Sequence, residues 1–194
     1  SVQSFQQKFD PDDPRIHKKV EEYSKTLIQQ IDTMSSIASA FSNFAKMPAQ
    51  KLELLNIIEV IELTLDIFPD SDIKFIPQES NISVNFDRSQ LIRIITNLVK
   101  NSIQSIPLNR TPNISIVVGS DNLEVIIVVK DNGSGVEDSI ESKIFEPRFT
   151  TKSSGMGLGL PMIKSIIETY NGSISFSSII GEGSEFTIRF PKNN

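Results

Sequence analysis

Pro48 divides the chain into two stretches with different sequence patterns. The stretch before it contains no glycine and repeats its apolar residues at the three- and four-residue spacing of one helical face. The stretch after it alternates between helical patterns and short runs rich in β-branched residues. The 194 residues suffice for one large domain and a smaller element. We therefore expect two units, residues 1–48 and residues 49–194.

The first stretch predicts a helical hairpin with a truncated first helix. Residues 1–9 have a helical pattern that Asp10–Pro11 interrupts. Asp13 and Pro14 then supply an N-cap and a first helical position. The second helix has one long apolar stripe: Ile16, Val20, Tyr23, Leu27, Ile31, Met34, Ala38, Phe41 and Phe44 or Ala45. Because residues 1–9 are too few to cover this stripe, we expect a dimer of hairpins. The alternative is that the stripe packs on the following domain.

Composition excludes several classes of function. The net charge of −5 argues against a nucleic-acid surface. The absence of cysteine removes disulfides and thiolate metal sites, and a single histidine removes a histidine-rich zinc site. No apolar run approaches the roughly 20 residues that span a membrane, and no signal peptide opens the sequence. Since the chain starts inside a helical pattern, we expect a piece of a longer protein.

The second stretch predicts an α+β fold. Asn56 and Asp87 are expected N-caps, with Glu59 and Gln90 completing capping boxes. The expected helices are 57–68, 88–105 and 158–170, and the expected strands are 73–76, 82–86, 114–118, 125–129, 173–178 and 185–190. A turn joins the first two strands, and hairpins join the third to the fourth and the fifth to the sixth. Three helices against a mixed sheet make a two-layer α/β sandwich.

Two asparagines on the helix 88–105 are a candidate metal site. Asn97 and Asn101 are four residues apart and share one face, with Lys100 beside it. Asparagine is a poor helix former, so the pair is unusual in mid-helix. An amide oxygen is a suitable ligand for Mg²⁺, which commonly bridges to substrate phosphates. The other interpretation is a pair of surface asparagines.

Two glycine-rich segments are candidates for the rest of a nucleotide site. Asp131 ends a predicted strand, where its carboxylate can accept a hydrogen bond from an amine such as that of adenine. Gly133 and Gly135 would let the backbone approach a flat base, although Asp-Asn-Gly is also a common turn. The segment 155–160 opens a helix, whose N–H groups favour phosphate. It is no dinucleotide fingerprint, because no strand precedes it.

The long polar segment between these glycines, residues 137–154, has the features of a mobile lid. Phe145 and Phe149 are candidates to anchor it, and Arg148 and Lys152 are candidates to meet phosphate. Ordinary packing is the alternative for the two phenylalanines.

Taken in order, these segments resemble the conserved boxes of bacterial sensor histidine kinases. NLVKN, DNGSGV, FEPRFTTK, GMGLGL and GEGSEFTIRFP are similar to the N, G1, F, G2 and G3 boxes, and the helix ending FSNFAKMP is similar to the second helix of the dimerisation and phosphotransfer hairpin. The resemblance covers essentially the whole chain and is nearest to the nitrogen-regulation type. It implies the ATP-binding α/β sandwich that these kinases share with DNA gyrase and mismatch-repair ATPases.

The resemblance implies ATP and Mg²⁺ as cofactors and a role for each box residue. Asn101 would coordinate Mg²⁺, with Asn97 and Lys100 assisting around the phosphates. Asp131 would bind the adenine amine, with Gly135 beneath the base and Ser184 supporting it through water. Thr150, Thr151 and Lys152 would order the lid, and Gly155, Gly157, Leu158 and Gly159 would wrap the phosphates. Ser184 replaces a more usual threonine but keeps the hydroxyl; Gln104 replaces a frequent basic residue, which favours Lys100 or Lys152 as the phosphate cation.

The family's reaction is transfer of the ATP γ-phosphate to a histidine on the first hairpin helix, for relay to the receiver domain of a response regulator. The motif around that histidine is absent, and the only histidine, His17, lies at the predicted hairpin turn. We therefore expect the acceptor upstream in the parent protein, and a chain that binds Mg-ATP without phosphorylating itself. The expected partners are a second copy and a response regulator, without nucleic acid. The expected location is cytoplasmic, with membrane anchoring only through other parts of the parent.

Three alternatives remain open. A gyrase-type ATP hydrolase would need a carboxylate where Asn97 stands, because an amide cannot act as a general base. A serine kinase of the anti-sigma type shares the fold but lacks the long hairpin helix. A dimeric scaffold that binds no nucleotide would not need the box residues.

Overall fold

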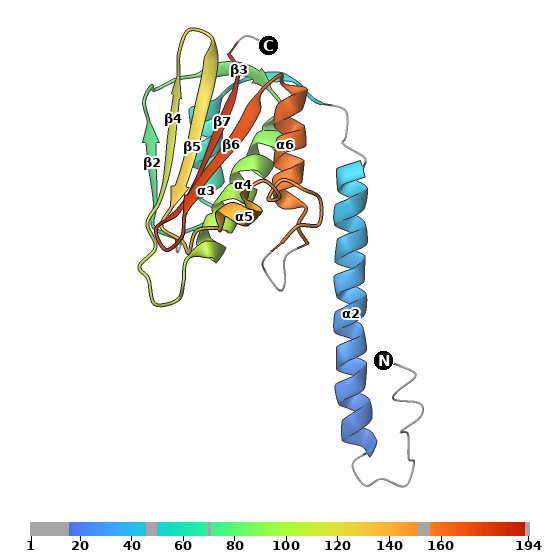
Figure 1. Ribbon diagram of the computed structural model, residues 1–194. Helices are drawn as coiled ribbons and strands as arrows, with labels where there is room; N and C mark the ends of the chain where they lie inside the picture. The colour runs from blue at the N-terminus through green and yellow to red at the C-terminus, as the bar shows by residue number, and fades with distance from the viewer. Residues whose placement is uncertain (1–15, 46–49, 70, 151–155, 193–194) are drawn as a thin grey trace. The chain divides into compact units, whose positions relative to one another are not determined.

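The computed structural model describes residues 16–45, 50–69, 71–150 and 156–192 (Figure 1). The chain separates into two compact units, Ser1–Met47 and Pro48–Asn194. The boundary falls beside Pro48, where the sequence pattern changes. That the first unit is part of a dimerisation hairpin remains a prediction.

The described part of the first unit is one long helix, α2 (Ile16–Ala45), which agrees with the predicted second helix. Within the single chain, several of its apolar side chains are exposed: Val20, Ile28, Ile31 and Met34. The predicted first helix, the break at Asp10–Pro11, the cap at Asp13 and the His17 side chain lie outside the described residues. The α2 helix therefore presents an apolar surface that the unit leaves accessible to solvent.

A five-stranded mixed sheet forms one layer of the second unit. Its strands, in spatial order, are β2 (Ile73–Pro77), β4 (Ile114–Ser120), β5 (Glu124–Asp131), β7 (Gly183–Pro191) and β6 (Ser173–Ile179). The β2–β4 pair is parallel and the other pairs are antiparallel. Both predicted hairpins, β4–β5 and β6–β7, are confirmed.

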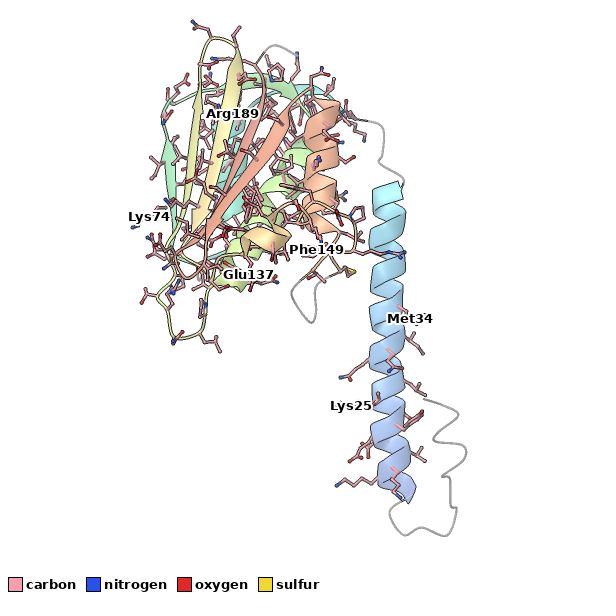
Figure 2. All side chains as sticks on the ribbon, in the orientation of Figure 1. Lys25, Met34, Lys74, Glu137, Phe149 and Arg189 are labelled. Atoms are coloured by element: carbon pink, nitrogen blue, oxygen red, sulfur yellow. The ribbon has the colours of Figure 1, made fainter. Side chains whose placement is uncertain are left out.

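Three helices form the other layer: α3 (Ile57–Leu65), α4 (Arg88–Ser105) and α6 (Gly159–Thr169) (Figure 1). Alternate residues of the central strands are buried, among them Ile116, Ile127 and Ile188, because successive side chains of a strand point to opposite faces. Lys74 and Arg189 occupy exposed positions of this alternation (Figure 2). The predicted α+β two-layer sandwich is confirmed.

The two early strands are present, but their pairing was not predicted. Residues 73–77 and 83–86 are both extended, but they belong to different sheets. Strand β3 (Ser83–Phe86) pairs antiparallel with β1 (Glu53–Asn56), a strand that was not predicted from the sequence. Strand β2 instead lies parallel to β4. Helix α3 also ends at Leu65, before the predicted Phe68. Local turn signals do not determine which distant strand becomes the neighbour.

The two predicted N-caps are present, but both capping boxes are completed differently. At α3, Glu59 Oε1 accepts a hydrogen bond from the Asn56 side-chain Nδ2 at 3.0 Å instead of from the Asn56 backbone N–H. Asn56 Oδ1 accepts the Ile58 N–H at the start of α3. At α4, Asp87 Oδ1 accepts the N–H groups of Ser89 and Gln90 at 2.9 and 3.1 Å. The Gln90 side chain does not return to the Asp87 N–H; it accepts a hydrogen bond from another residue, Tyr170. The reciprocal half of the predicted box at Gln90 is therefore wrong.

Candidate nucleotide site

Helix α4 presents the predicted polar residues at four-residue intervals. Asn97 and Asn101 are half-buried and Lys100 is exposed. Asn97 Nδ2 donates to the Arg93 carbonyl oxygen at 2.8 Å, which leaves Oδ1 directed elsewhere. A Cβ atom on Gly159 would lie 3.1 Å from that Oδ1. The start of α6 therefore passes close to the Asn97 amide.

The N-terminus of α6 has no side-chain cap. Leu158 is the N-cap residue, and its side chain makes no capping hydrogen bond. Such N–H groups lack intrahelical partners and can bind an anion. Gly157 precedes the helix with φ of +62°, and an added Cβ would lie 2.6 Å from the Phe149 carbonyl oxygen. Glycine is required here for both backbone conformation and space.

The segment predicted as a lid is closed at its base by the backbone. The Arg148 N–H donates to the Gly157 carbonyl oxygen at 2.9 Å. Arg148 itself has φ of +69°, which is unfavourable for a residue with a side chain. Phe149 is half-buried beside this junction (Figure 2). Phe145 is also half-buried, with Lys164 Nζ of α6 5.9 Å from its ring centroid.

For the other residues predicted to order the lid, the structure gives little information about their roles. Thr150 is exposed, and Thr151, Lys152 and Gly155 lie outside the described residues. The segment also contains a short helix, α5 (Asp138–Glu141). The bond between Arg148 and Gly157 thus joins the described residues on the two sides of 151–155, while the assigned roles of the segment's residues remain predictions.

Asp131, the last residue of β5, is 4% exposed. Its Oδ1 accepts the Gly133 N–H at 2.8 Å and the Ser105 hydroxyl at 3.1 Å. In the β5–β7 register Asp131 stands opposite Ser184, which is also buried and whose hydroxyl lies 3.0 Å from Ser178 Oγ. The structure thus brings the two predicted base-binding residues together on neighbouring strands.

The glycines after Asp131 contact the protein's own chain. A Cβ on Gly133 would overlap Ser105 Oγ, and one on Gly135, with φ of +70°, would overlap the Ile179 carbonyl oxygen at the end of β6. In the prediction from sequence, both glycines let the backbone approach a base. The structure gives each a requirement of its own within the fold, namely close packing against Ser105 and Ile179.

Two residues of the site were missed by sequence reasoning. Ser105 continues the four-residue spacing of Asn97 and Asn101, a signal that could have identified it. Arg110, in the loop after α4, donates from Nη1 to the carbonyl oxygens of Asn132 and Gly133 at 2.6 and 2.8 Å. No local pattern pointed to Arg110, because its partners are 22 and 23 residues away.

This arrangement defines a class of protein. A mixed sheet is covered on one face by helices, and one central helix carries an asparagine pair. A buried aspartate ends a middle strand, and the α6 helix, without a side-chain cap, starts after a long segment that glycines flank. These are the features of an ATP-binding α/β sandwich.

The comparisons with known proteins place the chain within that class. Residues 86–194, more than half of the chain, match the family described as histidine kinase-, DNA gyrase B-, and HSP90-like ATPases. The chain belongs to this family. It is 30% identical over 194 residues to the signal transduction histidine-protein kinase AtoS of Escherichia coli, covering 97% of this chain and 31% of AtoS.

Solved structures of histidine kinases have the same fold. The nucleotide-free catalytic domain of histidine kinase ThkA has a TM-score of 0.67 and 28% identity, covering 74% of this chain and 97% of that domain. The complex of ThkA with the response regulator TrrA has a TM-score of 0.72 at 21% identity, covering 98% of this chain and 55% of that chain, and supports the fold alone. The predicted membership of the sensor histidine kinases and the use of ATP are confirmed.

The chain spans less than half the length of each curated relative considered, from 19% to 45%. The activity and partners of the whole protein are therefore matters for proposal. In the ranges that the structure describes, no helix is both long and apolar enough to cross a membrane. The expected cytoplasmic location stays a prediction.

Proposed function

We propose that this chain binds Mg-ATP and transfers its γ-phosphate to a histidine of a two-component sensor kinase. One spatial arrangement carries the proposal: three positions of the proposed site follow one another along α4. Asp131 contacts Ser105, the start of α6 approaches Asn97, and Asn101 lies midway between Ser105 and Asn97 on the helix. Eight residues of helix separate Ser105 from Asn97, or roughly 12 Å at the usual rise. That separation suits an extended nucleotide with its base at Asp131 and its outer phosphates at α6.

Base recognition is assigned to Asp131. The Gly133 N–H and the Ser105 hydroxyl both bond its Oδ1, so Oδ2 is available to accept the exocyclic amine of adenine. Ser184, opposite Asp131 in the sheet, supports the base through water. A buried acceptor that goes unpaired is costly, so this geometry favours adenine over a base without the amine.

Phosphate binding is assigned to the start of α6 and to α4. The N–H groups from Gly157 to Gly159 meet the phosphates, together with Asn97, Lys100 and the lid residues Thr150, Thr151 and Lys152. No cluster of three or more histidine, aspartate or glutamate side chains suitable for a metal occurs in the described ranges. A single amide oxygen, from Asn101, fits Mg²⁺, which retains water and phosphate ligands and neutralises phosphate charge.

Phosphoryl transfer requires mainly positioning and charge neutralisation, which these residues supply. Asn97 carries no carboxylate to activate water, which favours transfer over hydrolysis. We propose that the acceptor histidine belongs to another part of the parent protein, because His17, the only histidine here, lacks the phosphoacceptor motif. The histidine kinase ThkA, whose catalytic domain is 28% identical to this chain, has been solved in complex with a response regulator. By analogy, we propose a receiver domain as the next acceptor.

An ATP titration in the presence of Mg²⁺ tests the site. The unsubstituted chain should bind ATP. Asp131→Asn should weaken ATP binding by at least about tenfold, the contribution of one hydrogen bond to a charged group. Asp121→Asn is the matched control. Asp121 lies in the turn at the opposite end of β5, where it accepts the Leu123 and Glu124 N–H groups. Absence of ATP binding by the unsubstituted chain would favour the alternative, a dimeric scaffold that binds no nucleotide.

Incubation with γ-labelled ATP tests the transfer step. We expect no acid-labile, base-stable label on this chain alone, and label on the first hairpin helix of the parent protein when that helix is supplied. Such label on the chain alone would show that His17 is an acceptor after all.

A further inference from the structure

The loop between α4 and β4 is joined to the segment that follows Asp131. Arg110 is half-buried, and its Nη1 donates to the carbonyl oxygens of Asn132 and Gly133 at 2.6 and 2.8 Å. Hydrogen bonds from a charged donor are stronger than neutral ones, and the planar guanidinium holds its N–H groups in a fixed direction. Two successive peptide groups are therefore oriented by one side chain.

The Asn132 side chain strengthens the same junction. Its Nδ2 donates to the Thr111 carbonyl oxygen and its Oδ1 accepts the Asn113 N–H, both at 2.9 Å. The loop and the segment are thus joined through three loop residues, Arg110, Thr111 and Asn113. Rotation of the Gly133 peptide would break the contact with Arg110 while the Asn132 bonds hold its neighbour in place.

The Gly133 residue connects this junction to the proposed base-binding carboxylate. The planar peptide group between Asn132 and Gly133 has its carbonyl oxygen, that of Asn132, held by Arg110 at 2.6 Å, and its N–H, that of Gly133, donates to Asp131 Oδ1 at 2.8 Å. The Gly133 carbonyl oxygen is held by Arg110 as well. The next residue, Ser134, donates its N–H to the Ser105 carbonyl oxygen at 2.9 Å. Ser105 is also the other donor to Asp131 Oδ1. The same carboxylate oxygen is therefore held from two sides, and its partner oxygen is turned away from both donors.

We propose that Arg110 is a positioning residue for adenine recognition: by fixing the Gly133 peptide it orients Asp131 so that Oδ2 faces the exocyclic amine. The inference rests on the proposed function, because it assumes that Asp131 reads the base. A loop residue that only stabilised the fold would affect every nucleotide alike. A positioning residue instead changes the part of the binding free energy that the 6-amino group of adenine contributes.

The experiment compares two nucleotides on the complete chain. The dissociation constants of ATP and of purine riboside triphosphate, which lacks the 6-amino group, are measured for the parent, Arg110→Ala, Arg110→Lys and a control, Arg88→Ala. Arg88 lies at the other end of α4 and pairs with Glu53 at 3.1 Å. Thermal unfolding establishes that each variant is folded.

The parent and Arg88→Ala should prefer ATP by roughly tenfold or more. Arg110→Ala should reduce this preference to about twofold, mainly by weakening ATP binding. The reason is that a displaced Asp131 carboxylate would lose most of its hydrogen bond to the exocyclic amine. Arg110→Lys keeps the charge but not the planar donors, so it should have an intermediate preference. If Arg110→Ala does not fold, Arg110→Lys carries the test alone.

An unchanged preference in the folded Arg110 variants, or a parallel loss of affinity for both nucleotides, overturns the inference while leaving the proposed function standing. A parent chain that binds neither nucleotide overturns the proposed function, and the inference with it. A parent that binds both equally overturns the role of Asp131 as the reader of the amine and therefore that of Arg110.

Discussion

The Tyr170 hydroxyl accepts the Asp87 backbone N–H at 3.1 Å and donates to Gln90 Oε1 at 2.8 Å. A residue just after α6 thereby completes the N-terminal cap of α4, 83 residues earlier in the chain. The Tyr170 ring also stacks on Phe86, with centroids 3.8 Å apart. The two helices that carry the proposed ATP site are thus joined at the ends remote from it.

Tyr170→Phe should destabilise the second unit by about 1–3 kcal/mol, because the ring and its stacking remain while two buried polar groups lose their partner. Urea unfolding at neutral pH measures the change. Ser83→Ala is the control, since the Ser83 hydroxyl bonds only the exposed Asn81 side chain and should cost less than about 0.5 kcal/mol. Equal stabilities for both variants would contradict the role given to Tyr170.

Acid should weaken the same cap. Burial alone would raise the pKa of Asp87, but the Ser89 hydroxyl and three backbone N–H groups outweigh burial and hold the pKa below its usual value. A pKa lowered by folding means that ionised Asp87 stabilises the fold above about pH 4, and this stability is lost as pH falls through the folded-state pKa.

The free energy of unfolding, measured between pH 7 and pH 3, should therefore fall more steeply for the parent than for Asp87→Asn. Asparagine is itself a good N-cap, so the two proteins should differ more in slope than in stability at neutral pH. Identical pH profiles would show that Asp87 does not contribute through its charge.

Gly157→Ala should disturb the base of the lid. Alanine at positive φ costs about 1–2 kcal/mol wherever it occurs, and here its Cβ also meets Arg148 and Phe149. Gly181→Ala is a matched control, since Gly181 has φ of +81° and no atom within 4 Å of an added Cβ. We expect both variants to lose stability but only Gly157→Ala to lose ATP affinity; equal affinities would argue against a lid anchored at Gly157.

Gly159→Ala separates stability from binding in another way. Within a helix, alanine is favoured over glycine by roughly 0.5–1 kcal/mol, but its Cβ would lie 3.1 Å from Asn97 Oδ1. We expect thermal stability to be kept or raised while ATP affinity falls, because the methyl group crowds the proposed phosphate site. Undiminished ATP affinity would place the phosphates away from Asn97.

The dimer expected from the sequence depends on the apolar surface of α2. Met34→Glu should shift the chain toward monomer in sedimentation equilibrium, because Met34 is 71% exposed in the single chain and a charge would be buried in the interface. Lys25→Glu, at another exposed position of the same helix (Figure 2), is the control for added negative charge. If the unsubstituted chain is monomeric at high concentration, the expected dimer is refuted.

Much of this protein follows from its sequence by itself. The N-caps at Asn56 and Asp87, the two hairpins, the glycine-rich segments and the pair of Asn97 and Asn101 depend on residues close together in the chain. Helical periodicity, strand alternation and capping act over a few residues, so their signals can be read locally. The same segments, in their order, also identified the family.

Only the tertiary structure decided the rest. It paired β2 with β4 and β3 with β1, brought Tyr170 to Asp87, and placed Arg110 against the peptides that orient Asp131. Each of these contacts joins residues far apart in the chain, and a loop arginine or a helix-end tyrosine has the same local pattern whatever it meets. Partners of this kind are selected by packing of the whole sandwich, because buried polar groups must find hydrogen bonds wherever the fold supplies them.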